Sequence, residues 1–354
     1  MDFNYSDDRR MLSDSLRRYL TDQYPIEQRN SVAYTAPYHS PDHWQALADL
    51  GVLGALITEA DGGFGGDGFD IAVIFEELGR ALCPEPVLGN LMALRLLAAF
   101  SATDHVNAVV AGSTQAALAL YEANSPDTLA DVATSATNDG GSWTLNGGKT
   151  AVYGGPCANL VLVAAKTDSG LGLFIATPSS IESNAAIDGG GLADMTFDNS
   201  PAECLSENAE QEIEAAIDAG RLALCAEAVG AADVLLEMTV DYLKQRSQFG
   251  QPIASFQALQ HRVVDMATEI EQARSMTILA ASKFDDAERM RFLAMAKNLI
   301  GRVATHIGEE ATQLHGGIGM TWEYGGAHYT KRLIMLDHQL GDRYNQVHRL
   351  LEAS

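Results

Sequence analysis

The spacing of apolar residues divides the chain into three blocks. From Asp7 to about Ser101 apolar residues recur every three or four positions, as in "MLSDSLRRYL" and "FDIAVIFEELGRAL", which predicts amphipathic helices. Between about Ala116 and Ser200 the apolar runs shorten to strand length and are separated by glycine, asparagine and aspartate, as in "WTLNGGKTAVYGG". Helical spacing returns from Ile213 to the end. The pattern predicts helices, then strands, then helices.

Helices and strands that occur in separate runs favour an α+β fold over a parallel sheet with crossover helices. The block boundaries predict an N-terminal helical domain over residues 1–115 and a central β-domain over residues 116–205. The remaining residues, 206–354, are predicted to form a C-terminal helical domain.

The charge balance excludes some classes of partner. The chain has 354 residues and a formal net charge of −24. This excess of acid disfavours nucleic acid and anionic membranes, because both are bound through basic side chains. No apolar run approaches the ~20 residues that a transmembrane helix needs, and "MDFNYSDDRRML" lacks the pattern of a signal peptide. We therefore expect a cytoplasmic protein that neither binds nucleic acid nor inserts into a membrane.

The cysteines and histidines do not suggest a metal site. The 4 cysteines lie far apart without a CxxC pair. His315, His328 and His338 lack a consistent ligand spacing combined with a second acidic or cysteine ligand. No metal is expected.

One glycine-rich stretch matches a nucleotide-binding fingerprint by spacing. Gly63, Gly65 and Gly68 in "ADGGFGGDGFD" follow the pattern GxGxxG. However, Asp61 and Asp67 would place carboxylates near a pyrophosphate, and the sequence continues as helix without the βαβ unit that the fingerprint requires. A turn between two helices, with glycines serving backbone conformation, is the preferred interpretation.

The stretch "RSQFGQPI" interrupts the best helical pattern of the chain. Arg246 follows a helical segment, and Pro252 cannot continue a helix. The planar guanidinium of Arg246 would suit a pair of phosphate oxygens, and Phe249 offers a face for a flat ring. Taken alone, this stretch favours an ordinary interhelical loop with a solvated arginine.

A second stretch, "QLHGGIGMTWEY", strengthens the case for a ligand. Gln313 supplies an amide that can donate and accept, while Gly316 and Gly317 allow a ligand to approach the backbone. Two such loops in one helical block suggest a composite cofactor site.

Both stretches, together with the order of the three blocks, resemble the acyl-CoA dehydrogenases over nearly the whole chain. The resemblance implies an antiparallel β-domain, a C-terminal four-helix bundle, FAD as cofactor, an acyl-CoA substrate and electron-transfer flavoprotein as acceptor. It implies that Arg246 meets the FAD pyrophosphate of the neighbouring subunit. The other residues expected at this FAD are Gln248 and Phe249 beside Arg246, and Gln313, Gly316 and Gly317 at the adenosine half.

The base that such a reaction requires is missing from both positions at which the family places a glutamate. These positions hold Leu340 and Gly220, and neither residue can accept a proton. The run that lines the flavin ring in the family keeps only Glu122 here, and after "NGGK" the chain reads "AVYGG", starting at Ala151.

This asymmetry predicts a heteromer. A chain that contributes only the phosphate clamp can still complete a site on a competent subunit. The pattern is similar to the small subunits of heteromeric members such as pimeloyl-CoA dehydrogenase. Two alternatives remain open: a homo-oligomeric enzyme with an unusual base such as Asp337 or Asp342, and a catalytically inactive scaffold.

Overall fold

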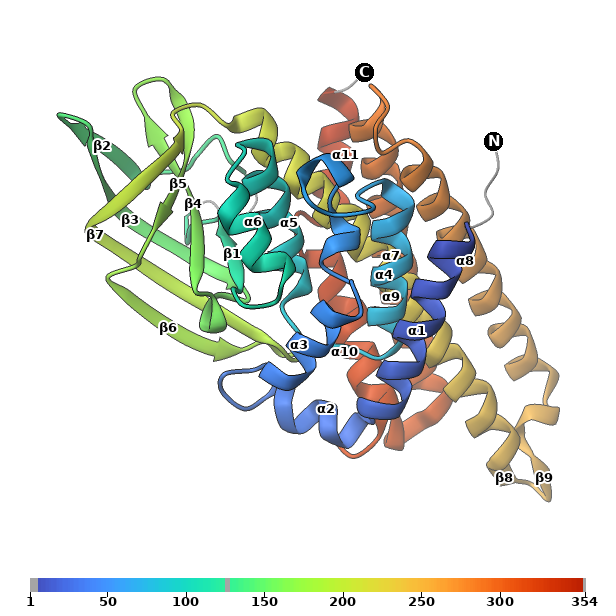
Figure 1. The fold of residues 1–354 in the computed structure, drawn as a ribbon. Coiled ribbons are helices and arrows are strands. Elements are labelled where there is room, and N and C mark those ends of the chain that lie inside the picture. Colours follow the sequence, from blue (N-terminus) through green and yellow to red (C-terminus); the bar gives the residue numbers. More distant parts are fainter. Residues whose placement is uncertain (1–5, 125–127, 353–354) are drawn as a thin grey trace. The chain divides into compact units, whose positions relative to one another are not determined.

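The computed structural model describes residues 6–124 and 128–352 (Figure 1). Its elements confirm the predicted fold class, with helices at both ends and a β-domain between them. The elements form two compact units. The helical unit contains the described residues up to Ile26, Gly68–Cys83 and the described residues from Arg221 onward, and the sheet unit contains Glu27–Asp67 and Pro84–Gly220. The linear domain boundaries at residues 115 and 205 remain a prediction.

Long helices build the helical unit. They are α1 (Asp7–Gln23), α4 (Gly68–Arg80), the larger part of α7 (Glu210–Gln245), α8 (Gln257–Ser282), α9 (Arg289–His315), α10 (Gly325–His338) and α11 (Arg343–Glu352). α8, α10 and α11 all pack against α9. α9 buries Ile300, Val303 and Ile307, which recur at helical spacing and form one stripe. Within the described ranges, no helix carries an apolar stretch sufficient to cross a bilayer.

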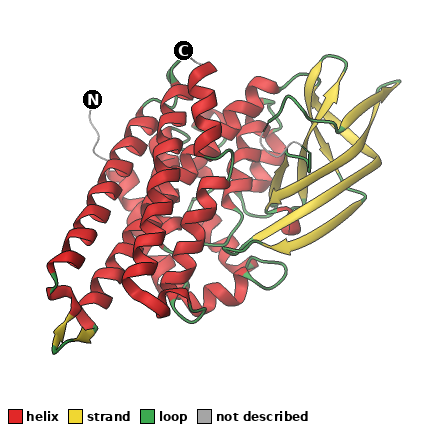
Figure 2. Cartoon of the chain, turned by 180° about the vertical axis from the view of Figure 1, so that it is seen from behind, coloured by secondary structure: helices red, strands yellow, loops and turns green. Residues whose placement is uncertain are grey.

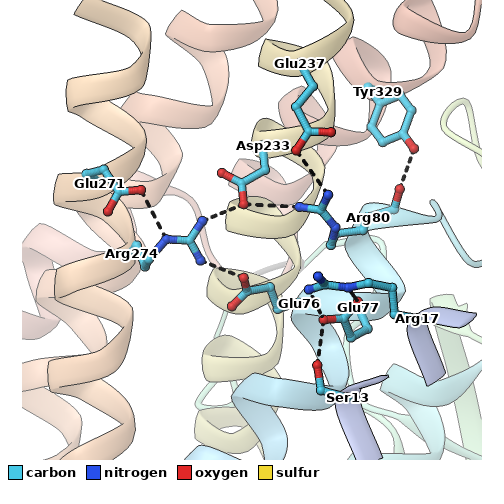
Figure 3. A network of polar contacts seen from close by, with 10 residues as sticks. All are labelled: Ser13, Arg17, Glu76, Glu77, Arg80, Asp233, Glu237, Glu271, Arg274 and Tyr329. Carbon is cyan, nitrogen blue, oxygen red and sulfur yellow. Dashed lines mark hydrogen bonds and ion pairs between the residues drawn. The ribbon is translucent and has the colours of Figure 1, made fainter. Parts of the chain in front are cut away.

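Ion pairs connect α4 to the later helices of the helical unit (Figure 3). Arg274 of α8 donates to Glu76 of α4 at 2.6 Å and to Asp233 of α7 at 2.5 Å. Arg80 of α4 pairs with the same Asp233 at 3.3 Å and with Glu237 at 3.2 Å. Burial raises the pKa of Glu76, although Arg274 opposes the shift. Ion pairs therefore hold α4 against α7 and α8, which follow it much later in the sequence.

α4 and α7 also touch backbone to backbone at two glycines. A Cβ atom added to Gly79 of α4 would lie 2.1 Å from the carbonyl oxygen of Glu227. One added to Gly230 of α7 would lie 2.0 Å from the carbonyl oxygen of Glu76. Only glycine fits at either position, because no Cβ atom tolerates an oxygen so close.

One seven-stranded sheet organises the sheet unit (Figure 2). Its strands are β1 (Ala116–Ala119), β2 (Ser135–Asp139), β3 (Ser142–Tyr153), β4 (Leu160–Thr167), β5 (Gly170–Ala176), β6 (Ser180–Ala185) and β7 (Gly191–Ser206). Six of them follow the order β1-β4-β2-β3-β7-β5, and β6 pairs with β7. β5 also pairs with β4, so the sheet closes on itself. The buried hydrophobic cluster of this sheet includes Leu145, Val163, Phe174 and Phe197.

The sheet is mixed rather than wholly antiparallel, which corrects one detail of the predicted fold. β1 runs parallel to β4, with Ala116 opposite Leu160, and β2 meets β4 in a parallel bridge at Ser135 and Lys166. Parallel neighbours need a long crossover connection. Residues 120–159 supply it, because they contain β2 and β3.

The glycine-rich loop that precedes α4 uses its backbone N–H groups internally. Gly63, Gly65 and Gly66 donate to carbonyl oxygens of the preceding segment, namely those of Thr58, Ile57 and Ala55 respectively. A dinucleotide-binding loop needs such groups free for phosphate oxygens. The structure therefore supports the interpretation of this stretch as a turn.

The remaining α-helices that precede β1 in the chain are α2 (Ile26–Ala33), α3 (Pro41–Asp49), α5 (Val87–Ala99) and α6 (Thr103–Val110).

Candidate functional site

The stretch "RSQFGQPI" forms a tight hairpin between α7 and α8 (Figure 1). β8 (Ser247–Gln248) pairs with β9 (Gln251–Pro252), and the residues between them, Phe249 and Gly250, have φ of 55° and 80°. Positive φ at both central positions defines a type I′ turn, whose twist matches that of the strands. The predicted break between helices is thus a hairpin, and Phe249 at its tip is 90% exposed.

Arg246 lies at the base of this hairpin, directly after α7. Its N–H donates to the carbonyl oxygen of Tyr242 at 2.8 Å, and its carbonyl oxygen accepts from Ile253 at 2.8 Å. The side chain is exposed, and within residues 6–124 and 128–352 no ion pair or hydrogen bond engages its guanidinium. Gln248 is exposed as well. An anchored backbone that carries an unpaired guanidinium suits an anionic ligand.

The second predicted loop begins in the last turn of α9. Gln313 is exposed, and α9 ends at His315. Gly316 has φ of 64°, a conformation that favours glycine. Cβ atoms built at Gly316 and Gly317 would meet nothing within 4 Å, so the protein's own packing does not demand glycine there. Open backbone at a helix end fits a ligand that approaches closely.

The structure brings the two loops to the same end of the helical unit. The ring of His315 stacks on that of Tyr242, with centroids 4.7 Å apart. Tyr242 precedes Arg246 by one helical turn, and Gly316 follows His315 directly. We call the two loops the clamp, and its members are the residues predicted to meet the cofactor: Arg246, Gln248, Phe249, Gln313, Gly316 and Gly317.

The two positions expected to hold a catalytic glutamate lack an ionisable side chain. Leu340 is 2% exposed and has φ of 56°. Its carbonyl oxygen accepts a hydrogen bond of 3.0 Å from Nε of Arg221. Gly220 directly precedes Arg221 in α7. The backbone at Leu340 is thus held in place, but no group at either position can accept a proton.

The two carboxylates considered as unusual bases are engaged in structure. Asp337 is 2% exposed and accepts hydrogen bonds from the backbone N–H of Arg343 at 3.0 Å and from its Nε at 2.7 Å. Asp342 accepts from the N–H groups of Tyr344 and Asn345 at 2.8 and 2.9 Å, which is the arrangement of a helix N-cap at α11. Both carboxylates stabilise the link between α10 and α11, which disfavours a role for either as a base.

Sequence reasoning missed a buried lysine beneath this link. Lys297 of α9 is 0% exposed, and its Nζ donates to the carbonyl oxygens of Leu336, Asp337 and Gly341 at 2.7, 2.9 and 3.2 Å. Burial lowers the pKa of Lys297 to about 8. The ammonium group holds the C-terminal end of α10 and the segment that contains Leu340. A lysine inside the apolar run "FLAMAKNLIG" was the available signal.

In the sheet unit Glu122 and Lys149 form a buried ion pair. Nζ of Lys149 donates to Glu122 and to the carbonyl oxygen of Leu120, both at 2.8 Å. The oxygens of Glu122 also accept from the N–H groups of Ala133 and Thr134 at 2.9 and 3.0 Å. Burial would raise the pKa of Glu122, but these hydrogen bonds outweigh it and lower the pKa to about 2. Glu122 is therefore a structural carboxylate.

The segment after "NGGK" has a second internal carboxylate contact. Ala151 has φ of 52°, and its N–H donates to Asp194 at 2.9 Å. Val152, the next residue, is 2% exposed. Glu122 and Asp194 thus take up backbone N–H groups in the segments that, by resemblance, would line a flavin ring.

The helical segments at both ends of the chain match the two domain models of one enzyme family. The N-terminal domain of the acyl-CoA dehydrogenases matches residues 6–105, and the C-terminal domain of that family matches residues 211–340. Acyl-CoA dehydrogenase IpdE2 of Mycobacterium tuberculosis is 31% identical, over 82% of this chain and 79% of that protein. The chain belongs to the acyl-CoA dehydrogenases, whose cofactor is FAD.

Solved structures share the whole fold. The Tcur3481-Tcur3483 steroid ACAD G363A variant superposes with a TM-score of 0.90 at 29% identity, covering 98% of this chain and 97% of that chain. The ChsE4-ChsE5 complex from Mycobacterium tuberculosis gives a TM-score of 0.90 at 21% identity, covering 99% and 98%. At that identity the second likeness shows the fold alone.

The clamp residues fit the phosphate half of FAD. The unpaired guanidinium of Arg246 offers N–H donors in the planar fork that matches phosphate oxygens. The open backbone at Gly316 and Gly317 leaves room for the adenosine side. In the sheet unit, Glu122 and Asp194 already accept hydrogen bonds from the N–H groups of Ala133, Thr134 and Ala151.

Proposed function

We propose that this chain is the base-lacking subunit of a heteromeric acyl-CoA dehydrogenase. Its clamp would hold the pyrophosphate of an FAD whose flavin ring lies on a catalytic homologous subunit. One contrast carries the proposal. Arg246 is exposed and, among the described residues, has no partner for its guanidinium, whereas the two expected base positions hold Leu340 and Gly220.

The reaction of the family makes this contrast meaningful. Desaturation removes a proton from the α-carbon of the acyl thioester, and the proton needs a general base within hydrogen-bond reach. FAD supplies the acceptor for the hydride from the β-carbon when it is bound. In this chain Arg246 would bind and orient the phosphates, while Asp337 and Asp342 are committed to α11. The α-proton would therefore pass to a carboxylate of the partner subunit.

The printed name of one similar structure supports a heteromer. At 29% identity, Tcur3481-Tcur3483 joins two protein designations. A site shared across an interface can be completed by a subunit that contributes only one part of it. The proposed role is similar to that of the small subunit of pimeloyl-CoA dehydrogenase. The substrate would be an acyl-CoA, and electron-transfer flavoprotein would be the electron acceptor.

Replacing Arg246 by alanine tests the proposal. The chain is co-expressed with an acyl-CoA dehydrogenase homologue of the same genome that has glutamate at one of the two base positions, and FAD is measured in the purified pair by absorbance. Loss of a charge-assisted contact to phosphate should weaken FAD binding by about 10- to 100-fold. The purified chain alone should desaturate no acyl-CoA.

Arg291→Ala is the matched control, because Arg291 is an exposed arginine of the same unit that pairs with the exposed Glu288. It should leave FAD affinity unchanged. Equal FAD affinity in Arg246→Ala and the parent pair would refute the clamp. Vigorous desaturation by the lone chain would refute the missing base.

A further inference from the structure

His315 is buried in the helical unit and contacts residues at the ends of three helices. It is 4% exposed. Its ring lies 4.7 Å from that of Tyr242 in α7 and 4.8 Å from that of Tyr324, the residue that precedes α10. Ala311, one turn earlier in α9, faces Nδ1 of the imidazole with its carbonyl oxygen at 2.7 Å. The imidazole therefore contacts the ends of α7 and α9 and the start of α10.

The hydrogen bonds of His315 leave its ring no free polar atom. A carbonyl oxygen only accepts, so Nδ1 carries the proton and donates to Ala311. In the neutral ring Nε2 then accepts from the hydroxyl of Tyr324. Burial lowers the pKa of His315 and raises the pKa of Tyr324 to about 12, so both groups are neutral near pH 7. The imidazole is engaged inside the protein and does not face a ligand.

Both loops of the clamp begin within one turn of this ring or of its stacking partner. The N–H of Arg246 is bonded to the carbonyl oxygen of Tyr242, which stacks on His315. Gly316 is the residue after His315. The clamp side chains are exposed, and the Arg246 guanidinium has no contact in the described residues that could fix its distance from Gly316. The exposed side chains of the clamp therefore do not fix the spacing between the two loops.

We infer that His315 is a positioning residue for the clamp, which holds the loop of Arg246 and the loop of Gly316 at the separation that FAD requires. This inference rests on the proposed function. Hydrogen bonds weaken steeply when their angle falls below about 120°, and binding groups work when rigid neighbours hold them to within about 0.5 Å. A stacked imidazole with both nitrogens bonded is such a neighbour.

A double-mutant cycle on FAD affinity separates this role from a merely structural one. The co-purified pair of this chain and its catalytic homologue is prepared with His315→Ala, Arg246→Ala, both changes or neither, and the dissociation constant of FAD is measured by flavin fluorescence. His315→Ala should weaken FAD binding by about tenfold when Arg246 is present. It should weaken binding by less than about twofold when Arg246 is already alanine.

Tyr324→Phe provides a milder variant if His315→Ala does not fold. It keeps the stacked ring and removes one hydrogen bond, and it should weaken FAD binding by about threefold, again only when Arg246 is present. His348→Ala, at an exposed histidine of α11, should change nothing. Equal losses with and without Arg246, or no loss at all, would overturn the inference and leave the clamp standing. No loss from Arg246→Ala itself would overturn the clamp and this inference together.

Discussion

Replacing Glu122 by alanine is expected to lower the free energy of unfolding by about 3 kcal/mol. Lys149 has a side-chain exposure of 0% and keeps its buried ammonium group when its carboxylate partner is removed. The N–H groups of Ala133 and Thr134 also lose their acceptor. An uncompensated buried charge and unsatisfied donors are among the few changes that cost this much. Urea unfolding followed by circular dichroism measures the loss.

The double variant Glu122→Leu/Lys149→Met serves as the control. Replacing both charged groups by apolar side chains of similar size removes the pair without leaving a buried charge, and such changes are often close to neutral. It should recover most of the stability that Glu122→Ala loses. The account of the pair is wrong if Glu122→Ala unfolds at the same urea concentration as the parent chain.

The same pair predicts a specific sensitivity to acid. Hydrogen bonds lower the pKa of Glu122 from its ordinary value of 4.5 to about 2. The stabilisation is therefore complete above pH 4.5 and is lost as the pH falls toward 2, because the unfolded chain takes up the proton first. The lowered pKa corresponds to about 3 kcal/mol in all, of which about 2 kcal/mol is lost between pH 6 and pH 3. Unfolding free energies of the parent and of Glu122→Leu/Lys149→Met, measured from pH 6 to 3, should fall more steeply for the parent, whereas parallel curves would contradict the shift.

The order of helices and strands could be predicted because amphipathic spacing is a local property of the sequence. Proline and glycine likewise marked the break after Arg246, although local signals did not reveal a hairpin with positive φ at Phe249. The parallel pairing of β1 with β4 was missed because it depends on where residues 120–159 cross. Pairing between distant strands is a tertiary property that periodicity does not report.

The candidate site divides in the same way. Two short motifs predicted the residues of the clamp, because such motifs combine residue types that recognise phosphate, and the structure places these residues in two exposed loops. The partners of the buried charged residues could not be predicted from the sequence. Glu122 and Lys149 are 27 residues apart, and Lys297 binds carbonyl oxygens some 40 residues later in the chain. Nothing in the local sequence around Asp337 distinguishes a buried structural carboxylate from a candidate base.

Replacing Gly230 by alanine is expected to destabilise the chain by at least about 3 kcal/mol. The new methyl carbon would lie 2.0 Å from the carbonyl oxygen of Glu76, so α4 and α7 would have to separate by more than an ångström. That movement would stretch the ion pairs that Arg274 makes with Glu76 and Asp233. The sign is informative, since alanine for glycine inside an ordinary helix stabilises by about 1 kcal/mol.

Gly325→Ala isolates the steric effect. Gly325 begins α10 in the same unit, and a Cβ atom there would meet only the terminal methyl of Met238, at 3.4 Å, and the side chain of Ile26. The flexible end of the methionine side chain can move, so Gly325→Ala should be neutral or slightly stabilising. The melting temperatures of the Gly230→Ala and Gly325→Ala chains are compared by thermal unfolding. Gly79→Ala, which meets the carbonyl oxygen of Glu227 at 2.1 Å, should behave like Gly230→Ala. A Gly230→Ala chain that melts at or above the temperature of Gly325→Ala would show that α4 does not lie against α7 through bare backbone.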